Sequence, residues 1–216
     1  MATPRKWSNV AIAMQSAAAS AITINSISKA SPGVVSYTGT DPANGDIVLL
    51  RVVGMYQLDL KVARVANVNG AGNTFELEGI NTTSFETFTS GTFEVITLGT
   101  SITSATTISG SGGDFGFIDT TTIHNNVRTQ IPDLPNALRY DMDHIWDVSD
   151  AGLVAMKAAG DAQALKVFRF TFGTGGQIML FAGYVATSLA PTGQAQQVVK
   201  TPSTFTVFGT PTYYSA

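Results

Sequence analysis

Short β-strand patterns separated by turn signals recur through most of the chain, and this arrangement constrains the fold more than any other feature. From residue 22 to about residue 93 the segments are ITINSIS, GVVSYTG, DIVLLRVVG, KVARVANV, NTFELEGI and GTFEVITL. Strands at a spacing of about 8 to 12 residues with Gly, Asn and Asp between them predict a small antiparallel β module. We expect Asn44-Gly45 to close a tight hairpin in it, because both residues tolerate positive φ.

The rest of the chain predicts further strands around one helix. Residues 9–16 have a strand pattern, and residues 17–20 are either a loop or a short helical turn, since alanine favours helix. Further strands are expected at 102–109, 115–123, 138–146, 165–172, 177–187 and 198–208. Residues 173–176, Gly-Thr-Gly-Gly, are expected to close a hairpin between two of these strands. The order of strands, one helix and more strands indicates an α+β fold that is mainly antiparallel sheet.

The segment 149–160 predicts one helix, with Ser149 or Asp147 as its N-cap and Gly160 just beyond its end. The strand before it alternates clearly between two faces. Leu138, Tyr140, Met142 and His144 share one face, whereas Arg139, Asp141 and Asp143 share the other. We expect the first face to lie in the core and the second to face water or a lumen.

Composition limits how such a chain is stabilised and used. The chain has no cysteine, which excludes disulfides and thiolate metal sites. Charged residues make up 12% of it, about half of the roughly 25% expected for a soluble domain. A surface with so few charges suggests that much of it is covered in use.

The formal net charge of −3 is confined to one segment. Between residues 114 and 143 there are five carboxylates and two arginines, whereas ten acids balance ten bases in the rest of the chain. Four of these carboxylates form two pairs of interest, Asp114 with Asp119 and Asp141 with Asp143.

The motifs FIDTTTIHNN, LRYDMDHIWD, FRFTFGTGGQIMLFAGYV and TPSTFTVFGTPTYY follow one another with a proline-containing loop and the helix between them. In this order they resemble the major tail tube protein of long-tailed bacteriophages, of the lambda-like tail tube family, over residues 8–20 and 93–214. The segment from PGVV to NTTSF looks like a β module that recurs as an insert in phage tail proteins. The resemblance therefore implies a tail tube domain at residues 1–21 and 93–216, interrupted by an inserted β module at residues 22–92.

The resemblance implies a structural virion protein and not an enzyme. The expected fold is two packed antiparallel sheets with one flanking helix, and the expected assembly is hexameric rings that stack into a conduit for double-stranded DNA. Expected partners are other copies of the chain and the tape measure, tail terminator and baseplate or tip proteins. The DNA would pass without specific binding, no cofactor is expected, and assembly would take place in the bacterial cytoplasm. We expect the inserted module to face outward.

A basic lumen would bind the phosphates of DNA and hold it, whereas an acidic lumen would repel DNA and keep it moving. We therefore hypothesise that at least one of the pairs Asp114/Asp119 and Asp141/Asp143 faces the pore. The alternative is that all four are ordinary solvated carboxylates.

The segment from Asn125 to Asn136 is expected to be a loop too long for a tight turn. The resemblance implies that it reaches a neighbouring subunit or the next ring, with Asn125, Arg128, Gln130 and Asp133 as contact candidates. The alternative is a mobile surface loop.

Other functions have weaker support in the sequence. Asp141, Asp143 and His144 are possible metal ligands, but on a strand the histidine points away from the two carboxylates. Neither His124 nor His144 accompanies a nucleophile motif, and the glycine pairs lack a phosphate-loop pattern. Trp7, Trp146, Tyr213 and Tyr214 would serve the main alternative, a β-sandwich module that binds carbohydrate or protein on a virion or cell surface.

The N-terminus has two cations before an apolar run, but Asn9, Gln15 and Ser16 interrupt that run, so we expect no cleaved signal. No apolar run approaches the roughly 18 residues of a spanning helix, and no membrane insertion is expected.

Overall fold

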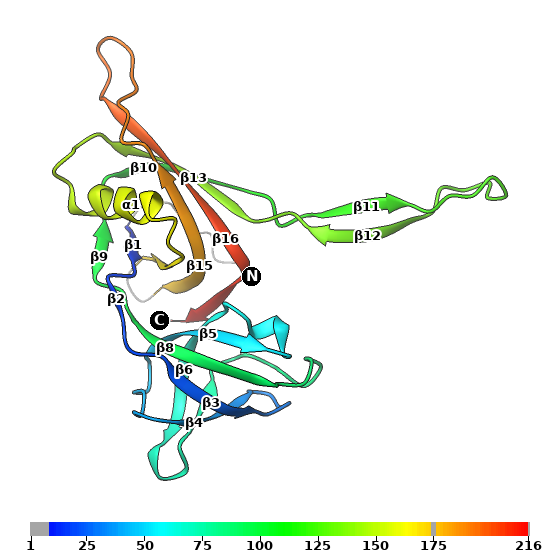
Figure 1. The fold of residues 1–216 in the computed structure, drawn as a ribbon. Helices are drawn as coiled ribbons and strands as arrows, with labels where there is room; N and C mark the ends of the chain where they lie inside the picture. Colours follow the sequence, from blue (N-terminus) through cyan, green and yellow to red (C-terminus); the bar gives the residue numbers. More distant parts are fainter. Residues whose placement is uncertain (1–8, 174–175, 216) are drawn as a thin grey trace.

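The computed structural model describes residues 9–173 and 176–215, and their regular structure is mainly β (Figure 1). The described residues form two seven-stranded antiparallel sheets, one two-stranded sheet and one α-helix. The expected mainly β fold with a single flanking helix is thus confirmed. No helix in the described ranges is long and apolar enough to cross a membrane.

The first half of the chain folds into a closed β-barrel. Its strands are β2 (Ala17–Ala18), β3 (Ile22–Ile27), β4 (Val34–Thr38), β5 (Ile47–Val53), β6 (Val62–Asn69), β7 (Thr74–Leu77) and β8 (Ser90–Thr97), with short 3-10 turns at Tyr56–Leu58 and Gly70–Gly72. The sheet order is β2-β8-β3-β4-β7-β6-β5, and β5 also pairs with β8. That last pairing closes six strands on themselves, which removes their free edges and leaves β2 as an addition to β8.

Aromatic rings fill the barrel interior. Tyr37, Phe75 and Phe93 are almost completely buried, and their ring centroids lie 5.1 to 5.7 Å apart. The tilted and edge-on arrangements of these rings are those that aromatic pairs favour. β4, β7 and β8 supply these rings, which gives the barrel a core of its own, separate from that of the other large sheet.

Two local expectations in this region were wrong. Residues 17–18 form a short strand instead of a loop or helical turn, because Ala17 and Ala18 pair with β8. Asn44 and Gly45 do form a turn, in which the Asp46 amide donates to the Ala43 carbonyl over 3.1 Å. This turn does not close a hairpin, because β4 pairs with β3 and β7 while β5 pairs with β6 and β8.

The second large sheet combines the start of the chain with its second half. Its strands are β1 (Val10–Met14), β9 (Thr100–Ile102), β10 (Ala105–Ser111), β13 (Arg139–Ile145), β14 (Lys166–Phe172), β15 (Gln177–Thr187) and β16 (Lys200–Ser215). Their order is β10-β13-β16-β15-β14-β1-β9. The expected hairpin of β14 with β15 is confirmed, although residues 174–175 of its turn lie outside the described residues.

Strand β16 is longer than the sequence predicted. It continues past Phe208 to Ser215, although Gly209 and Pro211 resemble a turn signal. Gly209 has a φ of 66°, and the register with β15 shifts between Leu180 and Ala182. An irregularity of this kind bends a strand without ending it.

The helix α1 (Ala151–Asp161) differs from expectation at both ends. Its N-cap is Asp150, whose Oδ1 accepts a hydrogen bond from the Leu153 amide over 2.7 Å, and not Ser149 or Asp147. Gly160 lies inside the helix. A Cβ there would come within 2.9 Å of the Val185 carbonyl oxygen, so this glycine allows the helix to approach β15 closely.

The helix and the barrel cover opposite faces of this sheet (Figure 1). Leu153 and Met156 of α1 pack on the face that carries the buried phenylalanines of β14, β15 and β16, including Phe168 and Phe205. The other face meets the barrel in a second apolar layer, formed by Leu49, Val62, Ile96, Val167, Leu180, Ala182 and Tyr214.

Polar contacts add to that second layer. The Tyr214 hydroxyl accepts from the Arg64 amide over 2.9 Å, and the Thr212 hydroxyl donates to the Val62 carbonyl over 2.7 Å. The barrel is therefore held on the sheet by apolar packing and by the end of β16. The division into a tail tube domain and an inserted domain at residues 22 and 92 stays a prediction.

Candidate functional site

A two-stranded hairpin projects from the body of the molecule (Figure 1). We call residues 114–136 the arm. Strand β11 (Phe115–Asp119) pairs with β12 (Gln130–Pro135), and every residue of both strands is exposed except the half-buried Gly116. At its root the Gly113 amide donates to the Asn136 carbonyl over 3.0 Å. The arm is thus a continuation of the β10–β13 pair beyond the sheet.

The expected loop from Asn125 to Asn136 was wrong in its second half, which is strand β12. The expected strand at 115–123 also ends earlier, at Asp119. Two prolines made the second strand hard to predict from the sequence, because proline lacks the backbone N–H that a central strand requires. In a hairpin of only two strands each strand has a free edge, so Pro132 and Pro135 are accommodated opposite Phe117 and Phe115.

The arm exposes large apolar side chains. Leu134 is 82% exposed and Ile123, near the tip, is 97% exposed. The others in the arm are Phe115, Phe117, Ile118, Val127 and Ile131. A two-stranded hairpin without a packed face is at best marginally stable in water, and clustered exposed apolar residues mark interaction sites. These two properties together indicate that a partner covers the arm.

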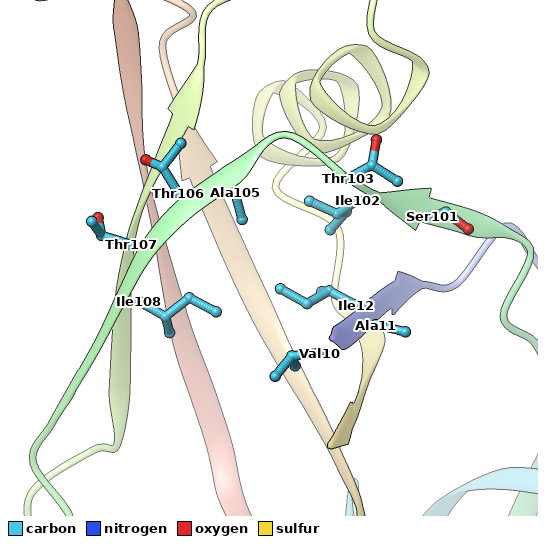
Figure 2. A pocket seen from close by; sticks show the side chains of 10 residues that line it. All are labelled: Val10, Ala11, Ile12, Ser101, Ile102, Thr103, Ala105, Thr106, Thr107 and Ile108. Atoms are coloured by element: carbon cyan, nitrogen blue, oxygen red, sulfur yellow. The ribbon is translucent and has the colours of Figure 1, made fainter. Parts of the chain in front are cut away.

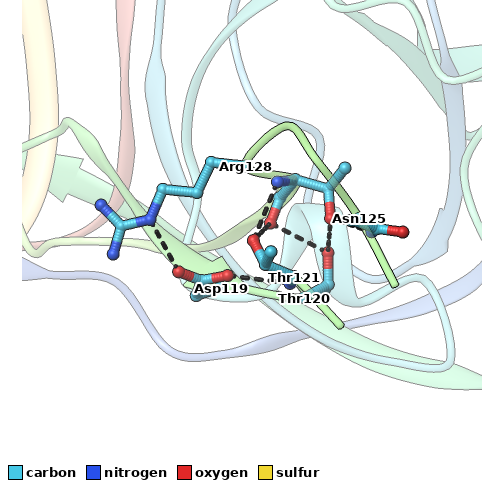
Figure 3. Close-up of polar contacts among 6 residues, drawn as sticks. Asp119, Thr120, Thr121, Asn125 and Arg128 are labelled. Carbon is cyan, nitrogen blue, oxygen red and sulfur yellow. Dashed lines mark hydrogen bonds and ion pairs between the residues drawn. The ribbon is translucent and has the colours of Figure 1, made fainter. Parts of the chain in front are cut away.

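Polar contacts order the tip of the arm (Figure 3). The Asp119 carboxylate accepts from the Thr121 amide over 2.8 Å and from Arg128 Nε over 3.0 Å. These contacts, with Thr121 contributing most, lower the pKa of Asp119. The Thr129 amide donates to the Thr121 hydroxyl over 3.0 Å, and the Asn125 side chain donates weakly to the Thr129 hydroxyl. Asp119 and Arg128, predicted for different roles, are therefore partners of one another.

The four carboxylates predicted to face a lumen are in two places. Asp114 and Asp119 lie on the arm, at its root and near its tip. Asp141 and Asp143 lie on β13, in the sheet. Of the contact candidates, Gln130 begins β12 opposite Asp119, Asn125 and Arg128 lie at the tip, and Asp133 lies within β12.

Asp141 and Asp143 share a polar sheet face with hydroxyl groups. Thr107 and Ser109 of β10 and Thr204 of β16 lie beside them, around a shallow hollow of about 280 Å³. Asp141 accepts from Arg139 and from the Thr204 hydroxyl, and these contacts lower its pKa.

Lys200 Nζ lies 3.9 Å from Asp143. With Arg139 near Asp141, two acids thus face two bases, and the formal charge of this group is zero. We call this surface, formed by Thr107, Ser109, Asp141, Asp143 and Thr204, the polar face.

His144 lies on the opposite side of β13 and is completely buried, as the alternation predicted. Its Nε2 is 2.7 Å from the Ser203 hydroxyl, and its Nδ1 is 3.3 Å from the Ser104 hydroxyl. A serine beside a histidine can serve as a nucleophile, but the burial of both His144 and Ser203 leaves no access for a substrate. Burial lowers the pKa of His144, so the imidazole is neutral near pH 7.

Metal and carbohydrate sites are not supported by the described geometry. The carboxylates of Asp141 and Asp143 point away from His144, and no group of three or more potential ligands occurs among the described residues. Trp146 lies just after β13 and beside the beginning of β16, because its amide donates to the Val199 carbonyl. Tyr213 and Tyr214 are at the other end of this 16-residue strand. These aromatics cannot form one platform, and Trp7 lies outside the described residues.

A hollow of about 550 Å³ lies between the two edges of the curved sheet (Figure 2). β9 and β10 form these edges, and Val10, Ile12, Ile102 and Ile108 point into the space. Its lining is aliphatic and hydroxyl-bearing, without a titratable side chain. It therefore offers no general base that could activate these hydroxyl groups as nucleophiles.

Comparison with models of protein families matches residues 53–216, more than half of the chain, to the family described as phage tail tube protein, TTP. The matched range includes β6 to β8 of the barrel, the arm, the helix and all later strands. A search of curated proteins found no match.

Proposed function

Because the chain belongs to the phage tail tube protein family, we propose that it forms hexameric rings that stack into the conduit for double-stranded DNA. Proteins of this family are structural components of the virion tail, so the chain is a structural subunit and not an enzyme. The finer points proposed here are the ring symmetry, the stacking and the passage of DNA.

The uncovered arm is the observation that carries this proposal. Seven large apolar side chains on it are exposed, so no layer of the described residues packs against them. Burial in another copy would remove about 25 cal/mol per Å² of apolar surface from water. A repeated subunit supplies such a cover for every arm except those at one end of the tube, which other tail proteins would cover.

We place the polar face toward the lumen. It lies on the sheet face away from α1, on β10, β13 and the beginning of β16, beyond the part of that face where the barrel packs on β14, β15 and the end of β16. Its hydroxyl groups and paired charges suit contact with water. Arg139 and Lys200 each lie beside a carboxylate, so this face offers no uncompensated cation to DNA phosphates. Because phosphate contacts dominate non-specific DNA binding, such a face lets DNA pass without being held.

We place the barrel on the outside of the tube, because a module of this size repeated around a ring would obstruct a DNA-sized channel. The proposed partners are other copies of the chain and the tape measure, tail terminator and baseplate or tip proteins. Assembly would take place in the host cytoplasm, and no cofactor takes part.

Electron microscopy of the purified protein tests the proposal directly. Negatively stained samples at rising concentration should contain rings or tubes with a central hole, and end-on averages should show sixfold symmetry. Monomers at every concentration, also with an excluded-volume agent, would contradict self-assembly. Rings of another symmetry would contradict the hexamer alone.

A further inference from the structure

A groove follows the junction between the barrel and the end of β16. Two adjoining hollows of about 500 and 270 Å³ form it, and Lys61 and Phe85 line both. Aromatic side chains make up much of its wall: Tyr56 is 68% exposed, Tyr213 is 65% exposed and Phe208 is 46% exposed. We call it the Lys61 groove. It is an open channel with exposed aromatic rings on its wall and a cation in its middle, and its polar lining includes Asp59 and Glu78.

Lys61 has no carboxylate partner in the part of the chain that the structure describes. Its Nζ donates to the Thr210 hydroxyl over 3.1 Å, and no ion pair forms with it among the described residues. Two acids also line the groove, but neither pairs with Lys61: Glu78 is held by Arg64, and Asp59 accepts from the Val52 amide. Burial lowers the pKa of Lys61. A partly desolvated ammonium without a counter-charge favours binding of an anionic group.

One face of the arm has complementary character. The antiparallel register places Ile118 opposite Ile131, and Gly116 shares the face of Ile118 by the alternation of β11. The register shifts where Asp133 lies, so its side is given by its closeness to Gly116. Gly116 lies beside Asp133, because a Cβ built on this glycine would be 3.6 Å from the Cβ of the aspartate. The Asp133 carboxylate accepts from the Leu134 amide and has no ion pair among the described residues. This face thus combines two exposed isoleucines with one free carboxylate.

The arm cannot fold back onto the groove of its own chain. β11 and β12 continue the β10–β13 pair, and Figure 1 shows the arm directed away from the barrel. About ten residues lead from the root to the tip, which corresponds to a reach on the order of 30 Å at the rise of a β-strand. An arm of this length and direction is suited to contact a different copy.

We propose that the Lys61 groove of one copy receives the arm of another, with Asp133 facing Lys61 and with Ile118 and Ile131 packed against Tyr56, Phe85 and Phe208. The charges are opposite and both surfaces are apolar and exposed, which is the complementarity that specific interfaces use. This inference rests on the proposed self-assembly and specifies one contact of it. It also gives the barrel a part in joining subunits.

Charge reversal tests the contact. Lys61→Glu and Asp133→Lys should each raise the critical concentration for tube formation roughly tenfold or more, because each places like charges opposite one another. The double variant should recover most of the loss. Lys29→Glu is the matched control, because Lys29 is an exposed barrel lysine, and it should assemble like the unmodified protein. Circular dichroism and thermal unfolding of each variant establish that the monomers are folded.

Disulfide trapping gives an independent test, because the chain has no cysteine of its own. Tubes assembled from a mixture of the Lys61→Cys and Asp133→Cys proteins should yield a disulfide-linked dimer on mild oxidation. A mixture of Lys29→Cys with Asp133→Cys should not. Acylation of Lys61 should also be slower in tubes than in monomers.

The outcomes separate this inference from the proposed function. Normal tubes from both charge-reversal variants, together with no trapped dimer, would overturn the groove contact while leaving the tube intact. The same holds if Lys61 is acylated equally fast in tubes and monomers, since the groove would then be open to some other partner. Absence of tubes from the unmodified protein would instead remove the proposed assembly, and the contact with it.

Discussion

At the scale of single residues, the buried His144 should make the stability of the monomer depend on pH. Its pKa is lowered in the folded chain because burial disfavours the charged imidazole, although Asp150 and Asp143 oppose this effect. The unfolded chain therefore binds more protons. The contribution of His144 to the free energy of unfolding should be fully present above the ordinary histidine pKa of about 6.5. It should be lost as the pH decreases below that value. Urea unfolding of dilute monomer between pH 8 and pH 5 measures this.

The second histidine provides the control for this prediction. His124 is exposed in the arm, so His124→Gln should leave the pH dependence unchanged. His144→Gln should lower stability at pH 8, because it disturbs the hydrogen bonds with Ser203 and Ser104, and should flatten the decline between pH 7 and pH 5. An undiminished decline in His144→Gln would assign the effect to the carboxylates.

Sequence alternation predicted the surroundings of β13 well and their partners poorly. The burial of Met142 and His144 and the exposure of Arg139 follow from a period of two, which is a local property. The serine that binds His144 is 59 residues away in the sequence, and only the register of β13 with β16 brings it close. The N-cap of the helix was predicted wrongly for a related reason. Asp147, Ser149 and Asp150 are all residue types that cap helices, and only the Asp150 side chain accepts a hydrogen bond from a helix amide.

At the scale of elements, the arm should be dispensable for folding and necessary for assembly. Its strands pair only with each other in the described sheets, and its side chains are exposed, so its removal uncovers no core. Deleting only Arg128–Pro135, within the segment that the sequence predicted to be a contact loop, would leave β11 unpaired. A cleaner variant replaces residues 114–135 by Asn-Gly, which closes β10 on β13 through the Gly113–Asn136 pair.

This variant should unfold within about 0.5 kcal/mol of the intact monomer, as expected for changes away from the core. It should form no tubes at concentrations where the intact protein does. Chemical unfolding and electron microscopy measure the two properties. Loss of folding would show that the arm supports the sheet, whereas normal tubes would remove its role in joining subunits.

Most strands could be located from the sequence, but their order could not. Alternation and turn residues locate a strand within a few residues, as they did for β3 to β8. Closure of the barrel depends on β5 pairing with both β6 and β8, and such pairings are chosen by the packing of the whole interior. The turn at Asn44-Gly45 illustrates this limit, because its local geometry is a turn whichever strands it connects.

At the scale of the whole molecule, the location of the negative charge has a meaning that the sequence could not supply. The window from residue 114 to residue 143 carries the net charge of −3, but the fold divides it between the arm and the polar face. On the polar face Lys200, from outside that window, compensates Asp143. The excess carboxylates are therefore on the arm, at Asp114 and Asp133, where a cation of another copy can meet them. Under the proposed assembly, part of the charge that suggested a lumen in the sequence would instead serve contacts between copies.

The proposed lumen makes a prediction about DNA. Asp141→Asn with Asp143→Asn would leave Arg139 and Lys200 without their carboxylates, which changes the formal charge of this group from zero to +2 in each subunit. Tubes of this variant should retain short double-stranded DNA at low salt and protect it from nuclease, and the retention should fall steeply as salt is raised. Co-sedimentation with labelled DNA measures it.

Glu76→Gln with Glu86→Gln on the barrel removes the same number of carboxylates. Tubes of this control variant should retain no nuclease-protected DNA, because the barrel is placed outside. Equal binding by both variants, with the DNA open to nuclease, would instead put the polar face on the outer surface, and the conduit would need a different lining.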